Sequence, residues 1–117
     1  GPMMRLDSLN PVIPPQTGKQ YLVTVAGVEN DAQSGTLLVS PVSFRLRDTA
    51  GMDWPATLEP VTLPGNTIPP FLTSNLSPGQ NAKGMIAFQI PTSVSAAAIV
   101  FQSPQAPGGE IVVEAHE

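Results

Sequence analysis

The sequence predicts an all-β protein, built as an antiparallel β-sandwich of two sheets and about seven or eight strands. The first observation is its 14 prolines and 10 glycines among 117 residues, because sterics and entropy keep both residue types out of helix interiors. The second is a series of short runs in which apolar and polar side chains alternate, which is the period of a strand. The third is the spacing of these runs, about ten to twelve residues with turn residues between them, which is typical of antiparallel sandwiches.

One domain accounts for the whole length. A chain of 117 residues can bury a core large enough to fold without metals or crosslinks, and the sequence contains no cysteine. We expect Gly1-Pro2 to be a scar left by protease cleavage and residues 3–117 to form a single domain. A native leader is compatible with this start.

Three strands, and a fourth segment that is a short strand or an irregular edge, are predicted in the first half of the chain. Residues 3–10 can form an edge strand, and the prolines between residues 11 and 15 favour an extended connection after it. Residues 19–30, KQYLVTVAGVEN, are apolar on both faces, as expected of a central strand. Residues 36–48, TLLVSPVSFRLRD, predict a half-buried strand in which Val42, Phe44 and Leu46 face the core. A turn at 48–51 then leads into a short strand or irregular edge at 52–58.

The second half begins with a long proline-rich connection, residues 60–80, of a length that is usually functional or mobile. Strands are predicted at 83–91, 96–102 and 110–115. In the first of them Gly84, Ile86, Phe88 and Ile90 share one face. Residues 93–98, SVSAAA, could instead form a helical turn, because alanine favours helix.

The charge and the hydropathy of the chain each argue against one class of partner. Its net charge is −4, and its five basic residues, at positions 5, 19, 45, 47 and 83, do not form a run. Nucleic acid is not an expected partner, because phosphate binding needs clustered Lys and Arg. A run of about 18 apolar residues would predict a membrane-spanning helix, and none occurs. Contact with a membrane is therefore expected only through a native anchor outside this sequence.

Few residues are suited to catalysis. The one histidine, His116, lies next to the end of the chain, where neither packing nor a second hydrogen bond can hold a catalytic imidazole in place. Structural zinc requires four Cys or His ligands, which this sequence cannot supply. We expect no enzymatic activity and no cofactor.

Calcium is the best metal hypothesis, because turns rich in carboxylate and amide oxygens supply its ligands. Two turns qualify, with candidate ligands Glu29, Asn30 and Asp31 in one, and Asp48 and Asp53 in the other. The simpler interpretation, which we favour, is that Asp31 and Asp48 cap their own turns through side-chain to backbone bonds. No metal is therefore expected.

Four stretches, taken in order, carry a family resemblance: KQYLVTVAGVEND, SPVSFRLRDTAGMDW, LSPGQNAKGMIAFQIP and IVFQ. They resemble a bacterial family of Ig-like domains of unknown function, in the immunoprotective-extracellular, immunoglobulin-like superfamily, that is found in secreted proteins and surface lipoproteins. The family pattern is a strand ending near an Asn, an F-x-L-x-D-x-x-G turn with an aromatic residue after it, then L-x-P-G, a Gly, an alternating strand and a Pro. The matching positions are Asn30, Phe44, Leu46, Asp48, Gly51, Trp54, Leu76, Pro78, Gly79, Gly84, Phe88 and Pro91.

The resemblance covers about residues 19–102 and implies an Ig-like sandwich with an extracytoplasmic location. It transfers no catalytic residues. Two features depart from the family: the lipobox cysteine is absent, and the stretch VTLPGNTIPPF has no counterpart in the pattern.

We therefore expect a non-enzymatic Ig-like module of a bacterial secreted or surface lipoprotein, serving as a structural or protein-interaction domain. Such a module presents loops from a rigid frame. The expected contact surface is the connection at 60–75, with Trp54, Ile68 and Phe71 as apolar anchors. Phe71 is expected to be exposed, because proline-flanked hydrophobes in loops often mark contact surfaces.

Two alternatives remain open. The domain could bind a carbohydrate or small ligand for a larger secreted protein, using Trp54 and Tyr21 for stacking. It could also be a cytosolic structural subunit in which an unpaired edge strand drives oligomerisation.

Overall fold

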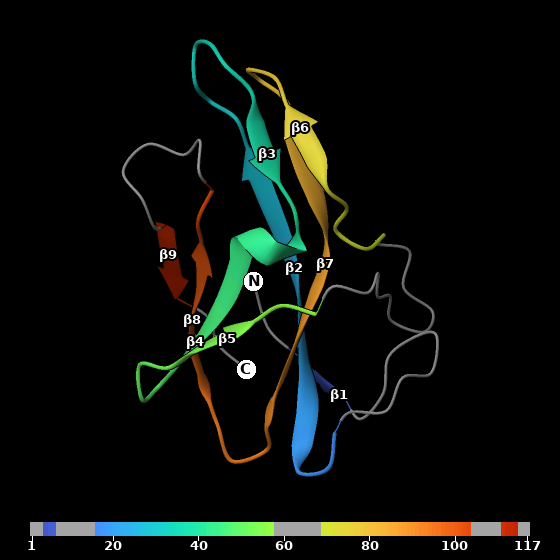
Figure 1. Ribbon diagram of the computed structural model, residues 1–117, viewed down its shortest axis with the longest axis vertical. Coiled ribbons are helices and arrows are strands. Elements are labelled where there is room, and N and C mark those ends of the chain that lie inside the picture. Colours follow the sequence, from blue (N-terminus) through green and yellow to red (C-terminus); the bar gives the residue numbers. More distant parts are fainter. Residues whose placement is uncertain (1–3, 7–15, 58–68, 104–110, 115–117) are drawn as a thin grey trace.

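A computed structural model describes residues 4–6, 16–57, 69–103 and 111–114 (Figure 1). Over these residues the chain is all-β, with nine strands and one short 3₁₀ turn. Every pairing between two named strands is antiparallel. The predicted antiparallel all-β fold is confirmed. Within the same ranges, no helix has the length and apolar character needed to cross a bilayer.

The strands are short except for two of eleven residues, β2 and β7. Their bounds are β1 Met4–Leu6, β2 Lys19–Glu29, β3 Leu37–Val39, β4 Phe44–Asp48, β5 Asp53–Pro55, β6 Ser74–Leu76, β7 Asn81–Pro91, β8 Ala96–Phe101 and β9 Ile111–Glu114, with the 3₁₀ turn η1 at Pro41–Ser43 between β3 and β4.

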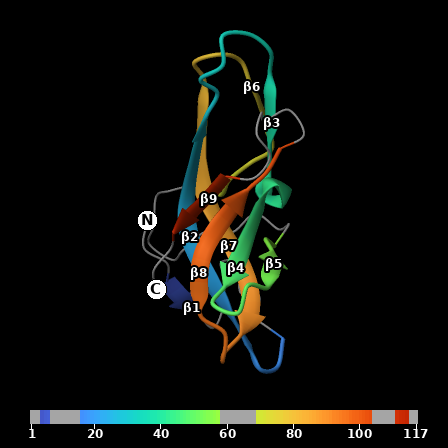
Figure 2. The ribbon, with the colours of Figure 1, turned by 90° about the vertical axis from the view of Figure 1, so that its left-hand side faces the viewer.

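The strands form two facing layers, consistent with a β-sandwich. One layer is a sheet of order β1-β2-β7, and the other is a sheet of order β5-β4-β8-β9. Figure 2 looks onto the four-stranded sheet, with β2 and β7 behind it. A separate two-stranded pair, β3-β6, lies toward the end of the molecule drawn at the top of Figure 1.

The core lies between the two layers. Leu22 of β2, Phe88 of β7 and Leu46 of β4 meet there and have no solvent exposure. Full burial of a side chain of this size contributes about 1.5–3 kcal/mol to stability. The other members of this cluster are Val39, Phe44, Ala56, Phe71, Leu76, Ile86, Ile90 and Phe101.

The pairing of β2 with β7 runs the whole length of both strands, from Lys19 opposite Pro91 to Glu29 opposite Asn81. Both faces of this pair are buried. Leu22 lies opposite Phe88 on the core face, and Val23 lies opposite Ala87 on the reverse face, where each is at most 2% exposed. The prediction that residues 19–30 form a central strand is confirmed, since β2 pairs with β1 on one side and with β7 on the other.

The second edge of β7 is covered by backbone from the segment before β6. The Phe71 N–H donates to the Met85 carbonyl at 2.9 Å, and the Met85 N–H donates to the Pro69 carbonyl at 2.9 Å. The approach is so close that a Cβ on Gly84 would lie 2.5 Å from both the Cα and the N of Phe71. Glycine at position 84 is therefore a condition for this contact.

Residues 36–48 do not form one strand, so the prediction that Val42 faces the core is wrong. The chain leaves β3 at Val39 and makes the η1 turn, in which the Ser43 N–H donates to the Ser40 carbonyl at 2.9 Å. Pro41 begins the turn, because it has no N–H to offer a strand partner. Val42 is consequently 68% exposed, while Phe44 and Leu46 of β4 are buried as predicted.

Two further expectations change in the second half. The described part of the 60–80 connection is not featureless, because β6 pairs with β3 within it. The helical alternative for residues 93–98 is wrong, since Ala96 begins β8 and pairs with Asp48 of β4.

Replacing Gly84 should test the close approach on β7. We expect Gly84→Ala to lower the free energy of unfolding by about 2–3 kcal/mol, because the Phe71 backbone must shift to admit the methyl group. Gly27→Ala is the matched control, since a Cβ there would make only ordinary contact, 3.9 Å from the Ala82 carbonyl oxygen. Urea unfolding of both variants measures the difference, and equal stabilities would contradict the inferred contact.

Candidate functional site

Asp48 organises the hairpin that joins β4 to β5. Its Oδ1 accepts the backbone N–H groups of Ala50 at 2.8 Å and Met52 at 2.9 Å. Its own N–H donates to the Met52 carbonyl at 2.9 Å. Gly51 has a φ of 86°, a left-handed conformation that favours glycine. The Asp and Gly of the F-x-L-x-D-x-x-G pattern are thus the two residues that shape the turn, and the interpretation of Asp48 as a turn cap is confirmed.

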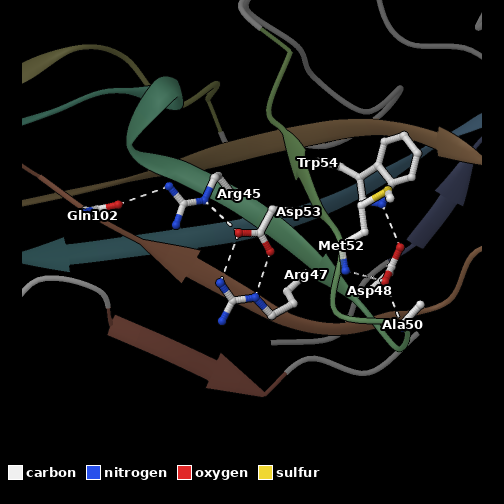
Figure 3. A network of polar contacts seen from close by, with 8 residues as sticks. All are labelled: Arg45, Arg47, Asp48, Ala50, Met52, Asp53, Trp54 and Gln102. Atoms are coloured by element: carbon white, nitrogen blue, oxygen red, sulfur yellow. Dashed lines mark hydrogen bonds and ion pairs between the residues drawn. The ribbon is translucent and has the colours of Figure 1, made fainter.

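Trp54 closes the same network from β5. Its indole Nε1–H donates to the second carboxylate oxygen, Asp48 Oδ2, at 2.9 Å (Figure 3). Trp54 lies opposite Leu46 and packs, partly buried, against the core. The Lys19 Nζ atom lies 5.9 Å from the centroid of the Trp54 ring, within the range of a cation–π interaction.

Asn30 plays the corresponding part at the end of β2. Its side chain is buried and donates through Nδ2 to the carbonyls of Gly35 at 3.1 Å and Leu76 at 2.8 Å. Its Oδ1 accepts the Ala32 N–H at 3.1 Å, and its carbonyl accepts the Gly79 N–H at 2.7 Å. The Asn30 side chain therefore joins the turn after β2 to the end of β6, and its backbone carbonyl joins the turn before β7.

A second polar cluster, the arginine cluster, lies on the outward face of the four-stranded sheet. Arg47 forms a two-pronged ion pair with Asp53, at 2.8 Å from Nε to Oδ1 and 3.0 Å from Nη2 to Oδ2. Arg45 approaches the same carboxylate at 3.2 Å and also donates to Gln102 Oε1 at 3.1 Å. The three charged side chains are 28–33% exposed, so they contribute little to stability but are accessible from solvent.

The hairpin thus carries one carboxylate on each side of the sheet. Asp48 alternates with Arg47 along β4 and lies on the buried side, whereas Asp53 lies opposite Arg47 and shares its outward face. Figure 3 shows the two groups on opposite sides of the β4 ribbon. Asp48 and Asp53 therefore do not converge, and the calcium site considered for this turn is not formed by them.

Hydrogen bonds set the charge of both carboxyls. The bond from the Trp54 indole, and next the one from the Met52 N–H, hold the pKa of Asp48 below its ordinary value of 3.8. For Asp53 the hydrogen bond from Arg47 is the main cause that lowers the pKa below the same value. Both groups therefore favour the charged form more strongly in the folded chain than in the unfolded chain.

The model of a family described as a domain of unknown function, DUF4352, matches residues 4–111. The chain belongs to the DUF4352 family. The match includes the whole span over which the motif residues fold into turns and strands. No curated protein and no solved structure matches this DUF4352 domain.

The three predicted binding residues do not form one surface in the described part of the domain. Phe71 is 2% exposed and packs edge-to-face on Phe44, with ring centroids 5.1 Å apart. The expectation that Phe71 is exposed is wrong, because the hydrogen bond from its N–H to the Met85 carbonyl holds its backbone on β7 and its ring packs into the core. Trp54 is partly accessible at the sheet edge, and Ile68 lies outside the described residues.

A stacking platform of Trp54 with Tyr21 is also not available. Tyr21 lies on β2 and is 3% exposed, so its ring offers no face to a sugar. The arginine cluster is the feature that sequence reasoning missed. Its signal was present, since Arg45 and Arg47 alternate outward on a strand and Asp53 follows the turn, but the pairing depends on the hairpin register.

A pair of substitutions should separate core from surface in the segment before β6. We expect Phe71→Ala to lower the free energy of unfolding by about 3–5 kcal/mol, as for other buried aromatic side chains. Leu72→Ala, at a neighbour that is 59% exposed, should change it by less than about 0.5 kcal/mol. Urea titrations measure both changes. An unchanged free energy of unfolding in Phe71→Ala would contradict the burial of this side chain in the core.

Acid should destabilise the domain through its two low-pKa carboxyls. Because both pKa values are lower in the folded chain, the unfolded chain binds more protons in acid, and the free energy of unfolding falls as the pH drops through 3.8. Above about pH 5 this contribution should be constant. Urea unfolding at a series of pH values measures the acid limb.

Asp48→Asn should reduce the slope of that limb and lower the stability at neutral pH, since an amide cannot accept on both of its terminal atoms. Asp31→Asn removes the same charge from an exposed turn and serves as the control. An unchanged limb in Asp48→Asn would contradict the role assigned to this carboxylate.

Proposed function

We propose that this DUF4352 domain is a non-enzymatic, extracytoplasmic Ig-like module, a structural or protein-interaction domain of a bacterial secreted or surface-anchored protein. The resemblance to Ig-like domains of secreted proteins and lipoproteins supports the location. The membership of the family supports the resemblance, since its model matches residues 4–111.

One observation carries the proposal: the polar motif residues are used to hold the frame together. The side chains of Asn30 and Asp48 are both buried, and their hydrogen bonds fix backbone turns. The indole N–H of Trp54 donates a hydrogen bond to Asp48. A motif of this kind builds a rigid support, and the work of recognition falls to side chains on the surface of that support.

The outward face of the four-stranded sheet is the surface that we assign to a protein partner. It carries the arginine cluster, whose charged side chains are 28–33% exposed, and the register of β9 on β8 adds Val112, which is 51% exposed. Protein interfaces are enriched in arginine and combine such apolar and charged groups. The face presents both signs of charge, which suits a partner surface that is itself mixed in charge.

The location can be tested with the full-length native protein. In intact cells that produce it, added protease should digest this domain, or the domain should appear in the medium, while a cytosolic marker stays intact. Complete protection of the domain until the cells are lysed would overturn the secreted or surface-anchored assignment.

The contact surface can be tested separately. After mild crosslinking on intact cells, a protein partner of the native chain should be recovered, and Val112→Glu should abolish its recovery. Val42→Glu, at another exposed valine that lies outside the sheet face, should leave recovery unchanged. Equal effects of the two substitutions would contradict the assigned face, and so would crosslinks that join only copies of this chain.

A further inference from the structure

The hairpin between β4 and β5 presents a methionine to solvent. Met52 lies directly before β5 and is 58% exposed, whereas Met85 of β7 is 3% exposed. A thioether reacts with oxidants according to its accessibility. The domain therefore holds two described methionine side chains in opposite situations, one open to reagents and one enclosed by packing.

The backbone of Met52 is fixed without any help from its side chain. Its N–H donates to Asp48 Oδ1 and its carbonyl accepts the Asp48 N–H, both at 2.9 Å. Gly51 takes the left-handed conformation that the turn requires. The hydrogen bonds that hold Met52 in the turn run to its backbone and not to its sulfur (Figure 3), so the thioether can change chemically without removing a hydrogen-bonding atom of the turn.

We propose that Met52 is a reversible oxidation site of the domain, with a peroxide as the oxidant. The sulfur lone pair attacks one oxygen of hydrogen peroxide, an S–O bond forms and the O–O bond breaks. The sulfur loses two electrons and becomes a sulfoxide, and the second peroxide oxygen leaves as water after proton transfer. A methionine sulfoxide reductase returns the sulfide by using the two electrons of a dithiol. This site is independent of the partner surface proposed above.

The same reaction has different consequences at the two methionines. An exposed sulfoxide at Met52 remains hydrated, so it adds no buried polar group. A sulfoxide at Met85 would place a polar oxygen in a packed, apolar position, at a cost in stability. Trp54, the only tryptophan of the chain, lies two residues from Met52 and reports a change at the hairpin by its fluorescence.

The test uses the folded chain in which Met3→Leu and Met4→Leu leave Met52 and Met85 as the only methionines. Hydrogen peroxide is added, and peptide mass spectrometry follows the gain of one oxygen atom at each site. We expect Met52 to react at least about tenfold faster than Met85, because Met85 reacts only after local opening. The urea midpoint should stay unchanged once Met52 is oxidised, and a methionine sulfoxide reductase with dithiol should remove the oxygen.

Two single variants complete the test. Met52→Leu should abolish the fast phase together with any peroxide-induced change in Trp54 emission, and Met85→Leu should keep the fast phase. Equal oxidation rates at Met52 and Met85 in the folded chain would overturn the proposal. A fall in the urea midpoint on oxidation of Met52, or a sulfoxide there that the reductase does not reduce, would overturn it as well.

Discussion

The constraint on which the rest of this structure depends is the pairing of β2 with β7. Eleven residue pairs join the two strands, and both faces of the pair are buried. In the middle of the pair a shift of one residue would exchange apolar side chains for other apolar side chains, whereas toward its ends it would turn Lys83 and Gln89 to the core face. Size adds a second constraint, because Gly84 lies where the Phe71 backbone crosses β7, and a shift of β7 against that segment would bring Lys83 or Met85 to this point. One missing side chain therefore helps to align β7 with the segment before β6.

Two buried polar groups extend that alignment to the turns. A buried polar group costs stability unless it is hydrogen-bonded. Asn30 and Asp48 each lie where a strand passes into a turn, and their side chains are hydrogen-bonded mainly to backbone groups. Each bond therefore removes two penalties, that of the side chain and that of the turn backbone. Asn30 follows β2 and Asp48 ends β4, so both strand ends are held by the same kind of hydrogen bonding.

Alternation along the sequence predicted most strands, because the side chains of β2, β4 and β7 follow the period of a buried sheet. It failed at two positions, Val42 and Phe71. Val42 continues the alternating pattern, but the turn begun by Pro41 carries it out to solvent. Phe71 was expected to be exposed because prolines flank it, yet those prolines only keep the chain extended. The hydrogen bonds of Phe71 and Pro69 with Met85, more than ten residues away, place this segment on β7 with the Phe71 ring toward the core. Local pattern cannot contain that information.

The β4–β5 hairpin carries both buried residues that pack on the core and the outward arginine cluster, so substitutions in one group affect the other. The Asp48 carboxylate works on the buried side of the sheet, where it fixes Met52 and holds the Trp54 indole. The same turn sets the register that brings Asp53 opposite Arg47 on the outward side. Loss of the Asp48 hydrogen bonds would therefore disturb the outward ion pairs as well, although no atom of Asp48 takes part in them. Surface chemistry on this hairpin can change by substitution at outward positions, while the positions that face inward must stay as they are.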